Sequence, residues 1–113
     1  MTDPATDADL GFASARELRA LYDAGEVAPS EAVAAVLRQV AARNPALNAF
    51  SCVMEAEAME AARASDARLA RGEGRALEGV PVTIKDFYDV AGQPTETGSF
   101  ALRKGVAGAD NPV

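Results

Sequence analysis

The predicted fold rests on residues 77–92, which read LEGVPVTIKDFYDVAG. Val80, Val82 and Ile84 alternate along the chain and have β-branched side chains, which predicts a strand with one apolar face. Lys85 closes that strand. Strand ends in α/β sheets face the crevices where ligands bind, so the position of Lys85 at a strand end makes it a candidate functional residue.

Two short amphipathic helices are predicted upstream of this strand. Ser14 and Glu17 are spaced as a capping box at the start of the first helix, and Gly25 supplies a left-handed end. Pro29 suits the first turn of the second helix. We expect that helix to stop at Pro45, because proline disfavours helical geometry in the residue that precedes it.

The other segments carry weaker signals. A third helix, rich in Ala, Glu and Arg, is predicted over residues 55–71, and a short strand over residues 49–53. Residues 1–12 are acidic and are interpreted as a solvated tail. Three further side chains are interpreted as core residues: Cys52, Phe87 and Tyr88.

The composition indicates a thin hydrophobic core. The chain has 113 residues, enough for one ordinary domain, and 49% of them are hydrophobic. Alanine supplies 26 of these, whereas Leu, Ile, Val and Phe together number only 23. That count is about the level below which charged chains tend toward disorder, so we expect the chain to be part of a larger folded protein.

The charge pattern excludes several functional classes. The 11 basic and 17 acidic residues give a net charge of −6, which argues against contact with nucleic acid or a membrane surface. Histidine is absent, so no Ser-His-Asp triad, Cys-His pair or histidine-ligated metal can be completed within the chain. The single cysteine excludes an internal disulfide.

Because we find neither a signal peptide nor an apolar run of membrane-spanning length, we expect a cytoplasmic location.

Lys85 has two interpretations that the residues alone leave open. In the first, its side chain reaches solvent or pairs with a carboxylate. In the second, it is desolvated and acts as a base or as a Schiff-base amine. A free lysine titrates near ~10.4, so the second interpretation requires burial that lowers this value by roughly 3 units. Asp86 would oppose that change, but adjacent strand residues point to opposite faces, so we expect Asp86 to bond backbone in the following turn.

The residues around Lys85 resemble a known family. GVPVTIKD at residues 79–86, VAG at residues 90–92 and TETGS at residues 95–99 are similar to the opening of the amidase signature family, and the likeness extends upstream to Ser14. The resemblance implies an α/β fold with a mixed central sheet covered by helices, of which this chain holds the N-terminal helices and first strands. We therefore expect an acidic tail at residues 1–12 and an incomplete amidase domain at residues 13–113.

The resemblance also implies a reaction. Amide hydrolysis in this family uses a Ser–cis-Ser–Lys triad, in which Lys85 would be the neutral base. Water would then hydrolyse the acyl-enzyme. Both serines lie downstream of the matched region, so we expect these residues to be an N-terminal piece that is inactive alone. The resemblance places Ser99 in a loop rather than in the triad. No metal or organic cofactor is implied, and four residues are expected to line the site: Thr95, Thr97, Gly98 and Ser99.

Two alternatives stay open. The chain resembles equally the A subunit of a glutamine-dependent tRNA amidotransferase, which uses the same triad on glutamine and passes ammonia to partner subunits. A non-enzymatic alternative is a small helical interaction module in which Lys85 is a surface charge. If the protein is an enzyme, we expect its substrate to be a small-molecule amide. The oligomeric state of the protein is left open.

Overall fold

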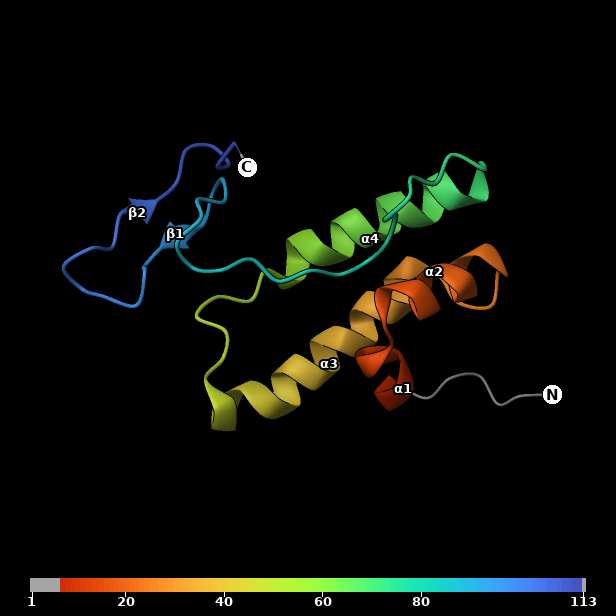
Figure 1. Ribbon diagram of the computed structural model, residues 1–113, viewed down its shortest axis with the longest axis horizontal. Coiled ribbons are helices and arrows are strands. Elements are labelled where there is room, and N and C mark those ends of the chain that lie inside the picture. The colour runs from red at the N-terminus through yellow and green to blue at the C-terminus, as the bar shows by residue number, and fades with distance from the viewer. Residues whose placement is uncertain (1–6, 113) are drawn as a thin grey trace. The chain divides into compact units, whose positions relative to one another are not determined.

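The computed structural model describes residues 7–112, which form helices followed by a small sheet (Figure 1). The chain divides into two compact units, Met1–Pro81 and Val82–Val113, and each is described here by itself. The elements in chain order are α1 (Asp7–Phe12), α2 (Ala15–Asp23), α3 (Pro29–Leu47), α4 (Glu55–Ala70), β1 (Pro94–Thr95) and β2 (Gly105–Val106).

The start and end of α2 confirm the predicted local signals. The backbone N–H of Glu17 donates to Ser14 Oγ at 3.2 Å, and the backbone N–H of Ser14 donates to Glu17 Oε2 at 2.7 Å. This reciprocal pair satisfies two donors that the first turn leaves without a helical partner. Gly25 follows the last turn with a φ of +70°, and Pro29 opens α3 as expected.

The end of α3 differs from the prediction. The helix runs through Pro45 to Leu47 and ends at Asn48, whose φ of 50° is left-handed and whose N–H donates to the carbonyl of Asn44. Pro45 lies in the last turn, where its missing N–H removes a single helical hydrogen bond. The left-handed residue, not the proline, therefore ends the helix.

Residues 7–12, the described part of the predicted tail, are helical. Residues 7–12 form α1, and Leu10 is 7% exposed in a cluster with Leu18, Tyr22, Ala32 and Ala35. The prediction of a solvated tail is wrong for residues 7–12 because Leu10 finds apolar cover in this cluster. The rest of the predicted tail lies outside the described residues.

The predicted strands do not form. Residues 80–85 and 49–53 contain no strand, and Val82 and Ile84 are 78% and 51% exposed. Within residues 7–112, no backbone hydrogen bond is formed by residues 82–84. Alternating β-branched residues favour an extended chain, but a strand exists only where a second strand accepts and donates its hydrogen bonds.

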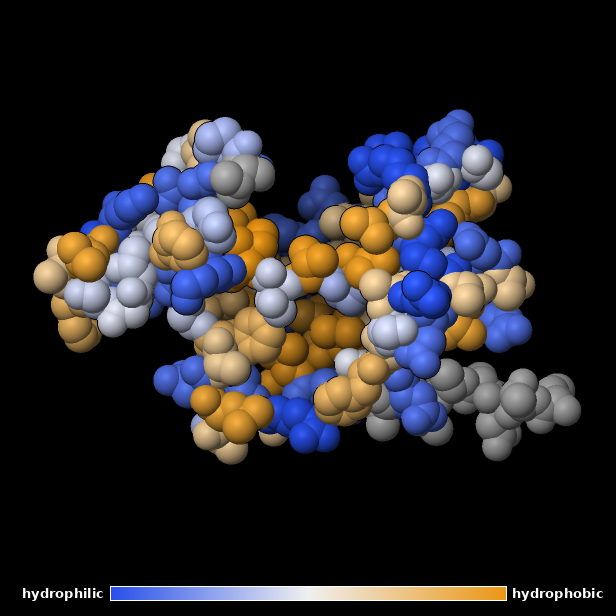
Figure 2. Space-filling view, in the orientation of Figure 1, coloured by the Kyte–Doolittle hydropathy of each residue, from blue (hydrophilic) through white to orange (hydrophobic). Residues whose placement is uncertain are grey.

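Three predicted core residues are exposed for a related reason. Cys52 is exposed, and Phe87 and Tyr88 are 45% and 37% exposed, with their ring centroids 4.4 Å apart. The prediction of core positions is wrong here because no layer covers them within the described chain. Other apolar side chains also reach the surface (Figure 2).

The helix α4 and a small sheet complete the described structure. α4 ends at Ala70 with Arg71 as its C-cap, which confirms the predicted third helix. β1 and β2 are antiparallel and pair Pro94 with Val106 and Thr95 with Gly105. Residues 7–112 thus hold helices and a two-stranded sheet, and within this range the mixed central sheet implied by the resemblance is not formed. None of its described helices has the length and apolarity needed to cross a membrane.

Candidate functional site

Lys85 lines a hollow in the second unit. The hollow has a volume of about 460 Å³, and Lys85 is the basic residue among those that line it: Thr83, Ile84, Lys85, Tyr88, Asp89, Val90, Asp110 and Asn111. The Lys85 carbonyl accepts hydrogen bonds from the N–H groups of Phe87 at 2.8 Å and Tyr88 at 3.1 Å. The chain therefore turns sharply just after the lysine. The Lys85 ammonium lies 5.6 Å from the Phe87 ring centroid, and the side chain is exposed.

Asp86 fixes the chain beside Lys85 to a segment ten residues later. Its Oδ1 accepts from the backbone N–H of Glu96 at 3.1 Å, and its carbonyl accepts from the N–H of Thr97 at 2.9 Å. The carboxylate therefore bonds backbone, and the N–H group that it accepts from lies in a loop ten residues away. One residue thus connects the lysine to the segment in which the other site residues were predicted.

Asp89 makes a second connection, which the sequence analysis missed. Its Oδ1 accepts from Thr95 Oγ1 at 2.8 Å, and the Lys104 ammonium lies 3.8 Å from the same oxygen. Thr95 is 1% exposed, so this hydroxyl–carboxylate bond forms inside the unit. The only sequence signal was an acidic residue a few positions beyond Lys85, which is too common to identify a contact.

None of the four predicted lining residues is among those that line the Lys85 hollow. Thr95 is buried, whereas Gly98 and Ser99 line a separate hollow of about 170 Å³. Thr97 has a left-handed φ of 59°, and its buried Oγ1 has no hydrogen-bond partner within residues 7–112. Ser99 lies in a turn, where its carbonyl accepts from Leu102 and Arg103. The structure thus joins the Lys85 segment to residues 95–97 through hydrogen bonds of Asp86 and Asp89.

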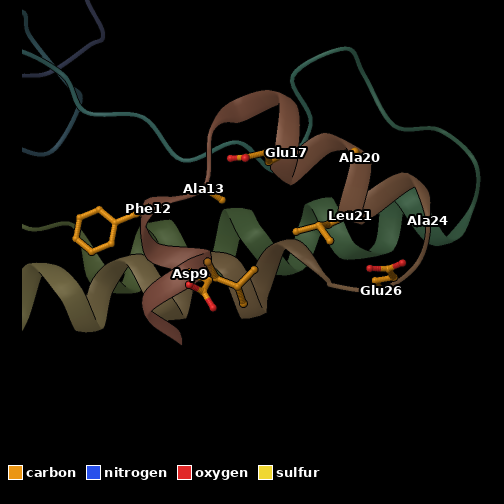
Figure 3. Close-up of a pocket in the computed structure, with 9 residues that line it drawn as sticks. Asp9, Phe12, Ala13, Glu17, Ala20, Leu21, Ala24 and Glu26 are labelled. Carbon is orange, nitrogen blue, oxygen red and sulfur yellow. The ribbon is translucent and has the colours of Figure 1, made fainter. Parts of the chain in front are cut away.

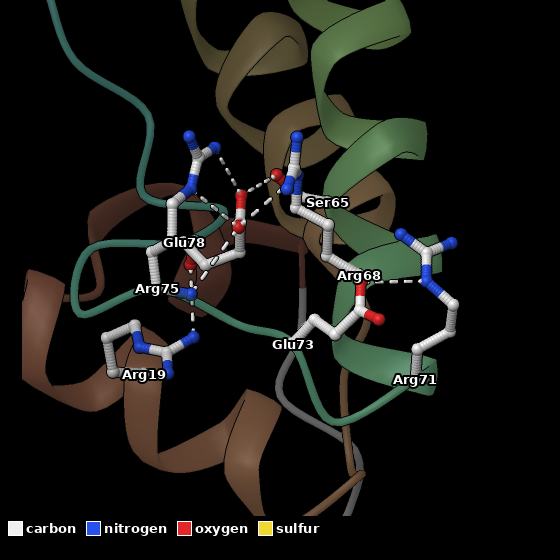
Figure 4. Close-up of polar contacts among 7 residues, drawn as sticks. All are labelled: Arg19, Ser65, Arg68, Arg71, Glu73, Arg75 and Glu78. Carbon is white, nitrogen blue, oxygen red and sulfur yellow. Dashed lines mark hydrogen bonds and ion pairs between the residues drawn. The ribbon is translucent and has the colours of Figure 1, made fainter.

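A buried carboxylate holds the chain just before the lysine segment, in the first unit (Figure 4). The Glu78 side chain is 2% exposed and accepts from Arg75 Nε at 3.0 Å and from Ser65 Oγ at 2.6 Å. These hydrogen bonds, first that of Arg75 and then that of Ser65, lower the pKa of Glu78 to about 2. The sequence analysis missed this cluster, because Ser65 and Glu78 come together only when α4 and the following loop pack.

The backbone of the same turn is held by α2. Arg19 Nη1 donates to the Glu78 carbonyl at 3.1 Å, and the Tyr22 hydroxyl donates to the Gly79 carbonyl at 2.9 Å. Burial raises the pKa of Tyr22 to about 12. Helices α2 and α4 therefore fix residues 78–79, where the family-like motif begins.

The structure offers no evident metal centre in the part that it describes. Across residues 7–112, no three His, Cys, Asp or Glu side chains are grouped so that they could hold a metal ion. The polar groups that line the Lys85 hollow are one amine, two aspartates, an amide, a phenol and the hydroxyl of Thr83.

Comparisons with known proteins place this sequence in a family. Residues 31–113 match the family model described as Amidase. The chain is also similar to proteins named as the A subunit of glutamyl-tRNA(Gln) amidotransferase. It is 40% identical to that of Mesorhizobium japonicum (83% of this chain, 18% of the relative), and 45% identical to that of Acidothermus cellulolyticus (83% and 19%). It is 41% identical to that of an Azoarcus species, over 89% of this chain and 21% of the relative.

These matches confirm the resemblance drawn from the sequence. The chain spans about a fifth of the length of the curated relatives that it matches, and no solved structure matches it. The matched range contains Lys85 and the whole of residues 79–99. The chain therefore belongs to the amidase family.

Proposed function

We propose that the protein hydrolyses a carboxylic amide, with Lys85 as the base that starts proton transfer. The observation that carries the proposal is the position of this lysine: it lies inside the family match, at a sharp turn, as the basic residue lining a hollow. The family match also favours an enzyme over the helical interaction module.

The proposed reaction needs two serines from a further part of an amidase domain. The neutral Lys85 amine takes a proton from a serine in a cis peptide, and that serine deprotonates the nucleophilic serine. The nucleophile attacks the amide carbonyl, the C–N bond breaks, and the relay returns a proton to the departing amine. Water then hydrolyses the acyl-enzyme. Four residues are proposed to shape the nearby loop: Thr95, Thr97, Gly98 and Ser99.

The proposed role of Lys85 requires its amine to be shielded from water, and its segment is exposed within the described residues. A free lysine titrates near ~10.4, so a lysine that acts as a base near neutrality must be desolvated. Val82 and Ile84 are exposed beside Lys85 and form no backbone hydrogen bonds within the described chain. We propose that strands of a complete amidase domain pair with this segment and cover the amine. The 113 residues alone are then expected to show no amide turnover.

A second candidate function is that of a glutaminase component of a larger enzyme. It is favoured by the relatives, which are named as the A subunit of glutamyl-tRNA(Gln) amidotransferase. In that case the substrate would be glutamine, and the ammonia would pass to partner subunits. The net charge of −6 gives no support for direct contact between this segment and tRNA.

A chimera tests both candidates. Residues 31–113 would replace the matching segment of the Acidothermus cellulolyticus relative, to which the chain is 45% identical. Hydrolysis of glutamine that depends on the partner subunits supports the glutaminase function, whereas hydrolysis of simple amides without partners supports an independent amidase. We expect Lys85→Met to lower turnover roughly 10²–10⁴-fold. The control Lys104→Met removes the other lysine and is expected to have little effect. Equal activity of the two variants would refute the role of Lys85.

A further inference from the structure

An acidic groove lies in the first unit, away from the lysine segment in sequence. It has a volume of about 760 Å³ and is formed by α1, α2 and the turn after α2. Its lining combines an apolar set, here named the floor, with three carboxylates, here named the rim (Figure 3). The floor is formed by Leu10, Phe12, Ala13, Ala20, Leu21 and Ala24, and the rim by Asp9, Glu17 and Glu26.

The floor of the acidic groove is an accessible apolar surface. Phe12 is 64% exposed, and Ala20 and Ala24 are also exposed, whereas Leu21 is partly buried against the helical core. Figure 3 shows the Leu21 side chain flanked by those of Asp9 and Glu26. Exposed apolar side chains gathered in one hollow and edged by polar groups are typical of an interaction site.

The rim determines the charge of the partner. None of the described residues that line the acidic groove is basic, so its three carboxylates give the groove a negative potential that attracts cations. Leu10 is buried among the helices, whereas all three rim residues are exposed. The Phe12 ring already contacts one cation of the chain, because the guanidinium carbon of Arg43 lies 5.0 Å from the ring centroid.

We propose that the acidic groove binds an amphipathic helix that carries lysine or arginine on both sides of an apolar stripe, contributed by a partner polypeptide. The apolar stripe would lie on the floor at positions i, i+3, i+4 and i+7, as in other helix-in-groove complexes. The basic side chains would approach the three carboxylates of the rim, of which that of Glu17 also keeps its capping contact with Ser14. This inference stands independently of the role of Lys85.

Fluorescence anisotropy with designed peptides tests the inference on the full chain. The probe is a labelled helical peptide of Leu, Ala and Lys with the apolar spacing given above. One comparison peptide carries Glu in place of Lys, and a second carries Ser in place of Leu. We expect the first peptide to bind at least about tenfold more tightly than either comparison peptide, with affinity that falls as salt rises. Equal binding of the Glu peptide or of the Ser peptide would overturn the inference.

Matched variants separate the acidic groove from the general negative charge of the protein. The pair Asp9→Asn and Glu26→Gln should weaken binding about tenfold, since each exposed charge contributes modestly. The control pair Glu55→Gln and Glu60→Gln removes the same charge from the exposed surface of α4 and should leave affinity within about twofold. Equal loss in both pairs would overturn the inference.

A second pair of variants tests the floor without changing charge. Ala20→Gln places a longer side chain in the acidic groove at an exposed helical position, and it should weaken binding at least about tenfold. Ala56→Gln makes the same change at an exposed site on α4 and should have no effect. Far-ultraviolet circular dichroism of each variant establishes that the helices persist. Unchanged binding by Ala20→Gln, or absence of binding by the parent chain, would contradict the proposal.

Discussion

Gly79 is the position where one added methyl group should lower the free energy of unfolding the most. It begins the family-like motif, has a φ of +76°, and accepts the Tyr22 hydroxyl on its carbonyl. A Cβ atom at this position would lie 2.6 Å from Pro29 Cγ and 3.0 Å from Tyr22 Cε2. Pro29 is fully buried and its ring is rigid, so it cannot move aside without disturbing the start of α3.

Two costs add in Gly79→Ala. A left-handed backbone costs a non-glycine residue about 1–2 kcal/mol. Overpacking of a filled core costs roughly another 1–3 kcal/mol, so the expected loss of unfolding free energy is about 2–5 kcal/mol. This is a large fraction of the roughly 5–15 kcal/mol that stabilises an ordinary domain.

Gly25→Ala is the matched control. Gly25 has a φ of +70°, close to that of Gly79, but apart from its chain neighbours no heavy atom lies within 4 Å of the point that a Cβ would occupy. The control therefore carries the backbone strain alone, about 1–2 kcal/mol. Urea unfolding followed by circular dichroism and by tyrosine fluorescence measures both values, since the chain has no tryptophan. If the two variants lose the same stability, the turn does not pack on Pro29 and the reasoning is wrong.

Three further predictions concern polar groups of the first unit. Tyr22→Phe removes the hydrogen bond to Gly79 and should cost about 1 kcal/mol in urea unfolding; in the parent chain, the stability that Tyr22 contributes should be full below pH 10 and be lost as the pH rises through its pKa of about 12. Glu78 has a pKa of about 2, lowered from 4.5, so its contribution should be full above pH 4.5 and be lost as the pH falls toward 2. In Glu78→Gln, the melting temperature should fall less between pH 4.5 and pH 2 than in the parent chain. An equal fall in both proteins would contradict the assignment. Ser14→Ala removes the cap of α2 and should cost about 1 kcal/mol by thermal melting, whereas Ser14→Asp should retain most of the stability.

Local signals in the sequence were enough to predict most of the helical unit. Ser14, Gly25 and Pro29 act through neighbours within four residues, so their effects can be read directly from the sequence. Pro45 was misread because its effect depends on its distance from the helix end, which Asn48 determines. Leu10 was missed because the few apolar residues of this acidic segment give no clear periodic pattern.

The lysine segment shows why the rest could not be predicted. The alternation of Val82 and Ile84 predicts an extended chain, but pairing depends on strands that are distant or absent from the described residues. Asp86 binds a loop ten residues away through one side-chain and one backbone acceptor, and no periodicity encodes such a contact. The identity of the candidate base, in contrast, followed from a contiguous motif that the family match now covers.

Chemical rescue of the chimera tests the central claim most directly. Lys85→Ala removes the proposed base and leaves space for a small amine, so turnover should fall and then rise in proportion to added ethylamine free base. Lys104→Ala, at the other lysine, should need no rescue. An account in which Lys85 takes the proton predicts this dependence on free amine. It is contradicted if Lys85→Ala without amine turns over amide within about twofold of the unsubstituted chimera, because general-base groups contribute roughly 10²–10⁴-fold.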